Sequence, residues 1–331
     1  MTSEAHGSIA LSVDDLVVRF KRPRASDVQA ISNVSISLPA RSTLALIGES
    51  GSGKSTFARA VCGLVPSTMG RVQVAGVELQ QGGMTARDAG AAGIQMVVQD
   101  SGGALNPRWP IWRIISEPYR LMQKRRGTEL RTLAAKILDD IGLPAEFLDR
   151  YPHQLSGGQR QRVNIARALA AEPTIIALDE AVSALDLSVR NEILGLLSRL
   201  KQSRELTYLF ITHDMGAVVQ IATHVAVLYL GKLVENGPVR EVVQQPKHPY
   251  TRALVGAVPT IGKPRAATVV AQGEADDAGA PPPGCRFHRR CPFVADVCRT
   301  TVPELTAYSG RQVACHRIQE IDDLLSEGGR T

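Results

Sequence analysis

The sequence predicts an α/β fold in four parts: an α/β core, an antiparallel β-subdomain before it, a helical subdomain inserted into it, and a small cysteine-rich extension at the C-terminal end. Three patterns support this prediction. Near-continuous apolar runs are typical of parallel strands that are buried on both faces. Residues 11–20 and 31–38 alternate between apolar and polar positions, as antiparallel strands do, and residues 112–148 have helical periodicity. The continuous apolar runs lie at 44–47, 174–178 and 208–212.

Length and charge narrow the class of protein. The chain of 331 residues is long enough for two domains, or for one large domain with an appendage. It lacks an apolar run of about 18 residues and an N-terminal secretory signal, so we expect a cytosolic protein with reduced thiols. The net charge of +6 occurs without long basic runs or interleaved aromatic residues, which argues against nucleic acid binding.

A glycine-rich turn follows the first apolar run. From Gly48 to Ser55 it reads G-x-x-x-x-G-K-S, the P-loop pattern, in which successive backbone N–H groups point at phosphate oxygens. A helix that begins at about Lys54 would direct its positive end to the same anion, and the Ser55 hydroxyl would bind Mg²⁺. The sequence therefore predicts a nucleoside triphosphate site. Its expected contacts are Gly48, Ser50, Gly51, Gly53, Lys54, Ser55 and Thr56.

Polar residues follow three further strands. Gln99 ends the strand at 93–99 and could turn its amide toward Mg²⁺ or an attacking water. Asp179 and Glu180 follow the run at 174–178, at the edge where α/β sheets keep their ligands. Asp179 would hold Mg²⁺ through water, and Glu180 would polarise the attacking water. His213, after the last run, would hold that water together with Glu180.

A second anion-binding helix start is expected at Ser156, which is a good N-cap before Gly157 and Gly158. Two such sites suggest a nucleotide held from both sides, one of them from another copy or a partner; the alternative is a capped helix with a flexible glycine pair. Phe20, at a strand end, could stack on adenine or belong to the core.

These motifs together resemble the ATP-binding subunit of ABC transporters. They are the P-loop, Gln99, Leu-Ser-Gly-Gly-Gln at 155–159, Ile-Ile-Ala-Leu-Asp-Glu at 175–180, Ser-Ala-Leu-Asp at 183–186, and His213. The resemblance covers about residues 10–240 and implies a P-loop ATPase core that forms a head-to-tail dimer around two ATP molecules. The further nucleotide contacts that it implies are Phe20, Ser156, Gly157, Gly158, Gln159 and Asp186.

Two segments resemble the oligopeptide/dipeptide importer branch: 99–108, which ends Leu-Asn-Pro-Arg, and His-Pro-Tyr-Thr-Arg-Ala-Leu at 248–254. Ser101 and Ala181 depart from it, because proline is usual at both positions. The branch implies an ATPase on the cytoplasmic face of the membrane, with two permease subunits, an extracytoplasmic binding protein and a second motor, more often a paralogue than a copy. Nickel, glutathione or opine cargo, a soluble ABC ATPase, or ATP binding without turnover remain alternatives.

The expected boundaries follow from these segments. They are a nucleotide-binding domain at 9–259 with its helical subdomain at about 100–167, a linker rich in proline, glycine and alanine at 260–283, and the extension at 284–331.

Four cysteines lie in the extension, whereas Cys62 is expected to be a buried packing residue. In a reduced compartment four thiols favour metal over disulfides, either Zn²⁺ or an iron–sulfur cluster. Resemblance to the importer branch, with Cys291-Pro292 at the second position, implies a [4Fe-4S] cluster rather than zinc; free thiols are the plain alternative. The proposed ligands are Cys285, Cys291, Cys298 and Cys315.

Overall fold

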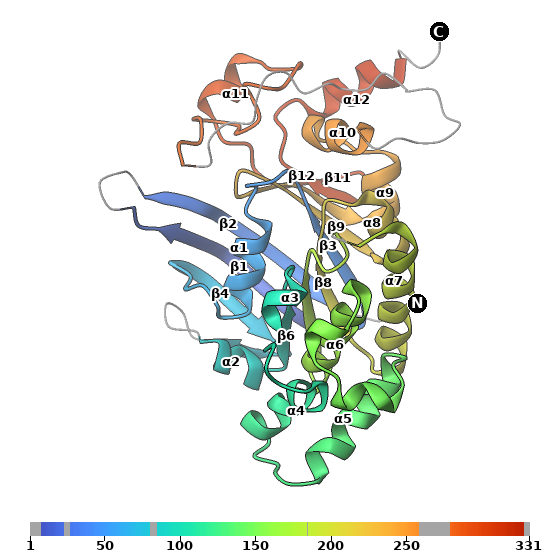
Figure 1. Cartoon of the computed structure of the whole chain (residues 1–331). Helices are drawn as coiled ribbons and strands as arrows, with labels where there is room; N and C mark the ends of the chain where they lie inside the picture. Colours follow the sequence, from blue (N-terminus) through green and yellow to red (C-terminus); the bar gives the residue numbers. More distant parts are fainter. Residues whose placement is uncertain (1–7, 23–26, 80–84, 184, 258–278, 328–331) are drawn as a thin grey trace, which may run out of the picture.

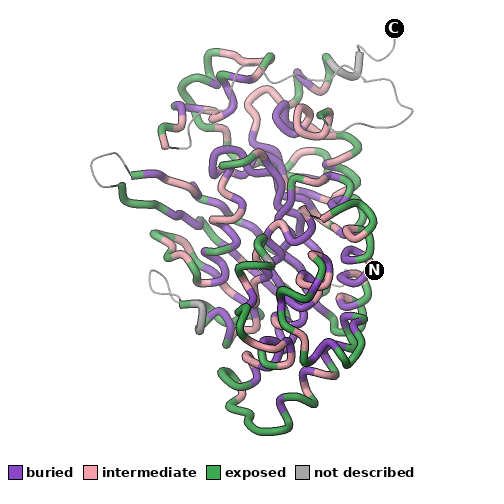
Figure 2. The backbone as a smooth tube through the Cα atoms, viewed as in Figure 1, coloured by how far each residue is buried: buried purple, intermediate pink, exposed green. Residues whose placement is uncertain are grey.

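Two sheets form the centre of the molecule. The computed structural model describes residues 8–22, 27–79, 85–183, 185–257 and 279–327. Within them, one sheet has the strand order β11-β12-β10-β9-β3-β8-β7-β6 and the other has the order β2-β1-β4-β5. Figure 1 shows helices covering the larger sheet, with the helical part at one end of the molecule and the C-terminal part at the other. The buried residues concentrate along the strands (Figure 2).

The middle of the larger sheet is parallel, as the apolar runs predict. Strands β3, β7 and β8 are buried along their whole length, which explains why their sequences do not alternate. Strand β3 pairs with β8 and β9, and β7 pairs with β6 and β8, all in parallel. The bounds are β3 (Thr43–Ile47), β6 (Ile94–Val97), β7 (Ile175–Asp179), β8 (Thr207–Ile211) and β9 (His224–Tyr229).

Helices follow these strands and cover the sheet. The first, α1, begins at Lys54 directly after the glycine-rich turn. The others follow in the order that the sequence periodicity indicates. The bounds are α1 (Lys54–Val61), α2 (Ala86–Ala91), α7 (Leu187–Ser203), α8 (Met215–Ile221), α9 (Val239–Gln244) and α10 (Pro249–Gly256). In the described part of the chain, no helix is both long and apolar enough to cross a membrane.

The N-terminal sheet is antiparallel, as the alternating pattern predicts. Strand β1 pairs with β2 and β4, and β4 pairs with β5. Residues such as Leu11 and Leu38 face each other across β1 and β2 and are fully buried. The bounds are β1 (Ile9–Phe20), β2 (Val28–Pro39), β4 (Met69–Val74) and β5 (Val77–Leu79). Cys62, just after α1, packs into the core beneath this sheet, as expected.

The helical part contains α3, α4, α5, two short 3₁₀ helices and α6. Ile114, Ile137 and Ile141, which lie in the segment with helical periodicity, are buried there. Leu121 is an exception at 65% exposed, because it lies in the last turn of α4, off the buried face that ends with Tyr119. The bounds are α3 (Ser101–Ala104), α4 (Ile111–Met122), α5 (Glu129–Asp140), Ala145–Asp149, Pro152–Gln154 and α6 (Gly157–Leu169).

The C-terminal extension is joined to the larger sheet, which the sequence did not predict. A hairpin of β11 (Thr306–Tyr308) and β12 (Arg311–Val313) pairs through β12 with β10 (Lys232–Pro238). Two helices, α11 (Asp296–Thr300) and α12 (Ile318–Glu327), complete the extension. Most of the linker expected at 260–283 lies outside the described residues.

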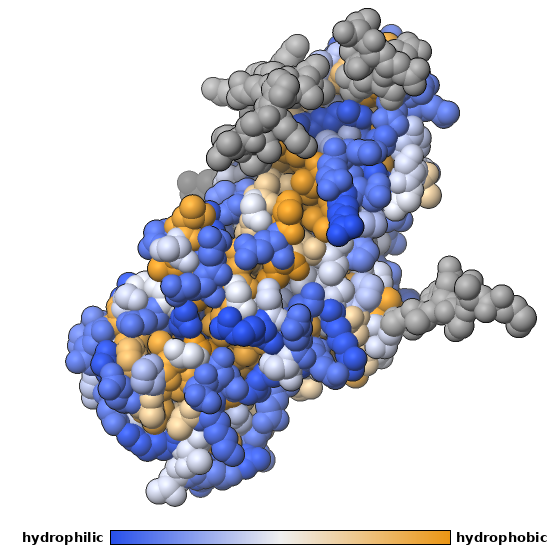
Figure 3. Space-filling model, turned by 90° about the vertical axis from the view of Figure 1, so that its right-hand side faces the viewer, coloured by the Kyte–Doolittle hydropathy of each residue, from blue (hydrophilic) through white to orange (hydrophobic). Residues whose placement is uncertain are grey.

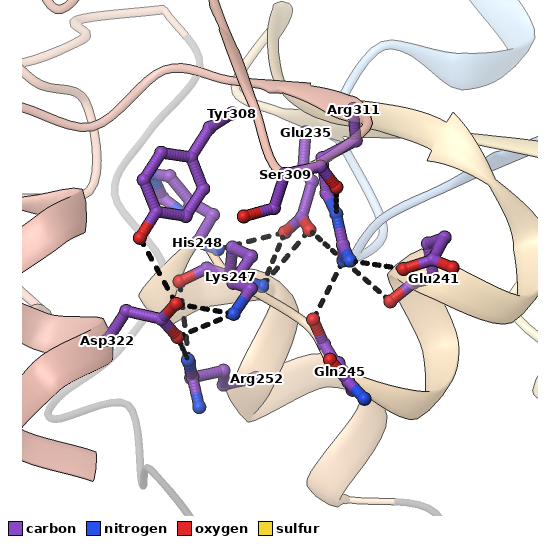
Figure 4. Close-up of polar contacts among 10 residues, drawn as sticks. All are labelled: Glu235, Glu241, Gln245, Lys247, His248, Arg252, Tyr308, Ser309, Arg311 and Asp322. Carbon is purple, nitrogen blue, oxygen red and sulfur yellow. Dashed lines mark hydrogen bonds and ion pairs between the residues drawn. The ribbon is translucent and has the colours of Figure 1, made fainter. Parts of the chain in front are cut away.

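Buried polar contacts fasten the extension to the core (Figure 4). The Arg311 guanidinium lies 3.4 Å from the buried Glu235 carboxylate and donates to the carbonyls of Glu241 and Gln245 at 2.6 and 2.7 Å. Lys247 and Arg252 both pair with Asp322 of α12. The extension is therefore held by charged groups of β10, of α10 and of Lys247 between α9 and α10, and by two backbone carbonyls at α9.

Candidate functional site

The glycine-rich turn has the backbone of a phosphate-binding loop. Gly48 has φ +152°, and a Cβ there would lie 2.2 Å from the Leu228 carbonyl oxygen. Gly53 has φ +102°, and its Cβ would lie 2.6 Å from the Ala30 carbonyl oxygen. Both positions therefore require glycine on conformation and on space. Ser50 and Gly51 are exposed at the tip of the turn, and Thr56 follows in the first turn of α1.

Lys54 lies inside this loop. Its Nζ donates to the carbonyl oxygens of Gly48 and Glu49, both at 2.8 Å. Burial lowers the pKa of Lys54, while the carboxylates of Glu180, Asp179 and Glu49 act in the opposite direction. An ammonium group held in this place is suited to bind phosphate oxygens.

Ser55 and Asp179 form the part of the site that fits Mg²⁺. Ser55 Oγ donates to Asp179 Oδ1 at 2.7 Å, while Asp179 Oδ2 is buried without a hydrogen-bond partner among the described residues. Burial raises the pKa of Asp179, partly opposed by the Ser55 hydrogen bond and by Arg59. A hydroxyl beside a carboxylate oxygen that lacks a hydrogen bond is the oxygen donor set that Mg²⁺ prefers.

Glu180, which follows β7, contacts Gln99 and His213, which follow the neighbouring strands β6 and β8. Gln99 Nε2 donates to Glu180 Oε2 at 2.8 Å, and His213 Nδ1 lies 3.4 Å from Glu180 Oε1. Glu180 also has φ +48°, a conformation that non-glycine residues adopt at a cost of about 1–3 kcal/mol and that clusters at functional sites. The carboxylate is 19% exposed and the imidazole 61%, so both can be reached from solvent.

The residues expected to contact the nucleotide held by a second subunit lie at the start of α6, away from the P-loop. Ser156 Oγ accepts from Gln159 N–H, and Gln159 Oε1 accepts from Ser156 N–H, so the start of α6 is a capping box. A Cβ on Gly158 would lie 2.5 Å from Val189 Cγ1, whereas one on Gly157 would meet its nearest atom, in Leu185, at 3.9 Å.

Asp186 caps the start of its own helix, and Phe20 lies at the exposed end of a strand. Asp186 caps α7 by accepting from Val189 N–H at 3.0 Å, and this hydrogen bond, with others from Ser188, lowers the pKa of Asp186. Phe20 ends β1 and is 41% exposed, which leaves its ring available for stacking on a base.

Arg59 was missed by the sequence reasoning. Its Nη2 lies 3.8 Å from Asp179 Oδ2, one helical turn beyond Ser55. The i, i+4 spacing from Ser55 on one helix was the available signal, because such residues lie on the same face.

The comparisons with known proteins decide the family. Residues 31–183 match the family described as ABC transporter. The Di/tripeptide transport ATP-binding protein DppF of Pseudomonas aeruginosa is 40% identical over 296 residues, which cover 89% of this chain and 92% of that protein. The chain belongs to the ABC transporter ATP-binding proteins.

Further likenesses agree with this ABC ATPase assignment and with ATP hydrolysis. Residues 234–298 match the family described as oligopeptide/dipeptide transporter, C-terminal region. The Dipeptide transport ATP-binding protein DppF of Escherichia coli K12 is 39% identical over 88% of each chain. A solved dimeric ATP-binding cassette, bound to ADP and phosphate after hydrolysis, has a TM-score of 0.61 and 28% identity over 70% of this chain and 99% of its own. The family and the α/β core predicted from sequence are confirmed.

The four C-terminal cysteines of this ABC ATPase line one small cavity, together with His248, Phe287 and His288 among others. Burial raises the pKa of Cys285 to about 11 and that of Cys291 to about 12. Among the described residues, no group of three or more His, Cys, Asp or Glu side chains is arranged to hold a metal ion. The four thiols thus line one cavity, but within the described residues they do not form a metal site.

Proposed function

We propose that this ABC ATPase is the motor subunit of an importer of dipeptides or oligopeptides. The observation that carries the proposal is the pairing of an ATPase core with a region, 234–298, that matches the C-terminal region of oligopeptide/dipeptide transporters. Relatives named for dipeptide and di/tripeptide transport support the same cargo class.

The proposed mechanism uses the strand-end residues. Ser55 and Asp179 would hold Mg²⁺, which would supply positive charge to offset that of the phosphates. Glu180 would accept a proton from the attacking water, and Gln99 and His213, which contact its two carboxylate oxygens, would orient the carboxylate and the water. Lys54 would bind the phosphates that the P-loop encloses, and Phe20 would stack on the adenine.

The proposal includes a second motor subunit. Ser156 and Gln159 use their polar atoms to cap their own helix, while Ser156 itself is exposed. Leu187, beside Asp186, is 68% exposed, and the face that carries α7 and α8 mixes apolar patches with hydrophilic surface (Figure 3). We propose a paralogous motor, two permease subunits, an extracytoplasmic binding protein, and attachment at the cytoplasmic face of the membrane.

For the four cysteines, we propose a [4Fe-4S] cluster in preference to Zn²⁺. Four thiols around one cavity suit a group several atoms wide, whereas Zn²⁺ needs sulfurs about 2.3 Å from a single centre. Arg317 lines the same cavity and would offset the negative charge of thiolate ligands. Iron and acid-labile sulfide, measured after anaerobic purification, should be found together. Stoichiometric zinc without sulfide would contradict the cluster.

Uptake of labelled dipeptide, oligopeptide and nickel tests the cargo in cells whose native gene is replaced by the Glu180→Gln variant. The wild-type gene at the same locus is the control, and equal amounts of both proteins must be verified by immunoblot. We expect the variant to lose peptide uptake while nickel uptake continues. Loss of nickel uptake alone, or unchanged uptake of all three without a compensating motor, would reject the proposal.

A further inference from the structure

The C-terminal extension makes a direct contact with the P-loop. Arg290 Nη1 and Nη2 donate to Glu49 Oε2 and Oε1 at 2.8 and 3.1 Å. Glu49 is the residue directly after Gly48, and 241 positions separate it from Arg290. Two parallel charge-assisted bonds fix both the place and the direction of the Glu49 carboxylate.

A second contact holds the main chain at the same residue. Glu49 N–H donates to the Tyr250 hydroxyl at 2.8 Å. Tyr250 is 1% exposed, and its ring packs against Tyr229 and Phe287, with centroids 4.6 and 5.4 Å away. Because Tyr229 lies on β9, Tyr250 on α10 and Phe287 in the extension, this aromatic group joins three segments beneath the loop.

The charge of Glu49 makes these contacts important for nucleotide binding. A carboxylate within the loop that encloses a triphosphate repels the phosphates unless a cation neutralises it. Arg290 provides that cation from a side chain that is only 10% exposed, and its hydrogen bonds to Glu49 raise the pKa of Arg290, so it stays charged. The Glu49 carbonyl also accepts from Lys54 Nζ, so a shift of Glu49 would move the phosphate-binding lysine.

Arg290 has a rigid support. Arg286, in the same loop of the extension, donates to the Leu230 carbonyl and to Ser32 Oγ, and Gly231 N–H donates to the Ser52 carbonyl within the P-loop. The buried pair of Arg311 with Glu235 and the pairing of Lys247 with Asp322 fix the rest of the extension (Figure 4).

We propose that Arg290 of the C-terminal extension and Tyr250 of α10 are positioning residues of the ATP site, and that the extension sets nucleotide affinity through Arg290. Arg290 neutralises Glu49 and Tyr250 holds its backbone, so that the loop is ready for the triphosphate. This role concerns ATP binding and is independent of the transported cargo, so it can fail while the peptide-import proposal stands, or the reverse.

The test measures the Kd for MgATP and, separately, kcat and KM of the full-length protein. Arg290→Ala should raise Kd and KM about tenfold with a much smaller change in kcat, because a partly buried charge pair loses its cation. Adding Glu49→Gln to Arg290→Ala should restore Kd to within about threefold of wild type, since the repelling charge is gone. Arg299→Ala removes an exposed arginine from the same extension and should leave Kd unchanged.

Tyr250→Phe extends the test to a variant of the same shape, in case Arg290→Ala does not fold. It leaves Glu49 N–H without its acceptor and should raise Kd severalfold while the circular dichroism spectrum stays that of wild type. Two results would overturn the proposal. One is unchanged Kd in Arg290→Ala or in Tyr250→Phe; the other is a double variant, Glu49→Gln with Arg290→Ala, that binds as weakly as Arg290→Ala.

Discussion

Ser55 Oγ donates a 2.7 Å hydrogen bond to Asp179 Oδ1, and this bond joins the first turn of α1 to the end of β7. The pair is 124 positions apart in the chain, yet it brings the two oxygen donors proposed for Mg²⁺ into contact. The buried second oxygen of Asp179 lacks a hydrogen bond among the described residues, so the carboxylate is held at a cost when it is charged.

Asp179→Asn should therefore leave the unliganded protein at least as stable as wild type, although it removes a proposed Mg²⁺ ligand. Burial raises the pKa of Asp179, so its contribution to stability is present below the unfolded pKa of about 4 and is lost as pH rises through the folded pKa. Without nucleotide, the variant should have a Tm at pH 7 at least as high as wild type, and the difference should shrink as the pH is lowered toward about 4.

MgATP should raise the Tm of wild type and leave that of Asp179→Asn nearly unchanged, as measured by scanning calorimetry. Asp139→Asn, an exposed carboxylate on α5, is the matched control and should behave as wild type in both respects. A lower Tm for unliganded Asp179→Asn at pH 7, together with a normal response to MgATP, would contradict this assignment.

Gly158→Ala should destabilise the fold by about 1–3 kcal/mol, because its Cβ would lie 2.5 Å from Val189 Cγ1 and must displace it. Gly157→Ala is the steric control, since its nearest neighbour is 3.9 Å away, and it should change stability by less than about 0.5 kcal/mol. Urea unfolding of both variants measures the difference. Adding Val189→Ala should recover much of the loss in Gly158→Ala, and equal stabilities of the two glycine variants would refute the steric account.

Arg311→Ala should cost about 3–5 kcal/mol, because it leaves the buried Glu235 carboxylate without its cation. Glu235 keeps hydrogen bonds from the N–H groups of Lys247 and His248, so part of its solvation is retained. Adding Glu235→Gln should restore part of the stability by removing the unpaired charge. Denaturant unfolding checks both, and a loss below about 1 kcal/mol for Arg311→Ala would show that the pair does not anchor the extension.

The site residues that could be predicted from sequence are those whose chemical role can be inferred from a short local sequence pattern. The P-loop, the acidic pair after β7 and the capped start of α6 each combine a strand or helix boundary with polar residues at a fixed spacing. Parallel strands end at one edge of the sheet, so Gln99, Glu180 and His213 could be expected to lie together.

The contacts that were missed join segments with no shared pattern. The sequence predicts a separate cysteine-rich extension, yet β12 completes the main sheet and Arg290 reaches the P-loop across 241 positions. Seven arginines in the extension offered no local signal to distinguish Arg290 from its neighbours. Such pairings depend on the packing of whole elements, which hydrophobic periodicity does not encode.

The central claim is that Glu180 is the base in an active ATPase, and paired measurements of hydrolysis and binding test it most directly. Glu180→Gln keeps the shape of the side chain, and its amide oxygen can still accept from Gln99 Nε2, but it cannot accept a proton. We predict a fall in the steady-state rate of ATP hydrolysis of at least about 100-fold, with the Kd for MgATP within about threefold of wild type. An unchanged rate of hydrolysis in Glu180→Gln would contradict the account.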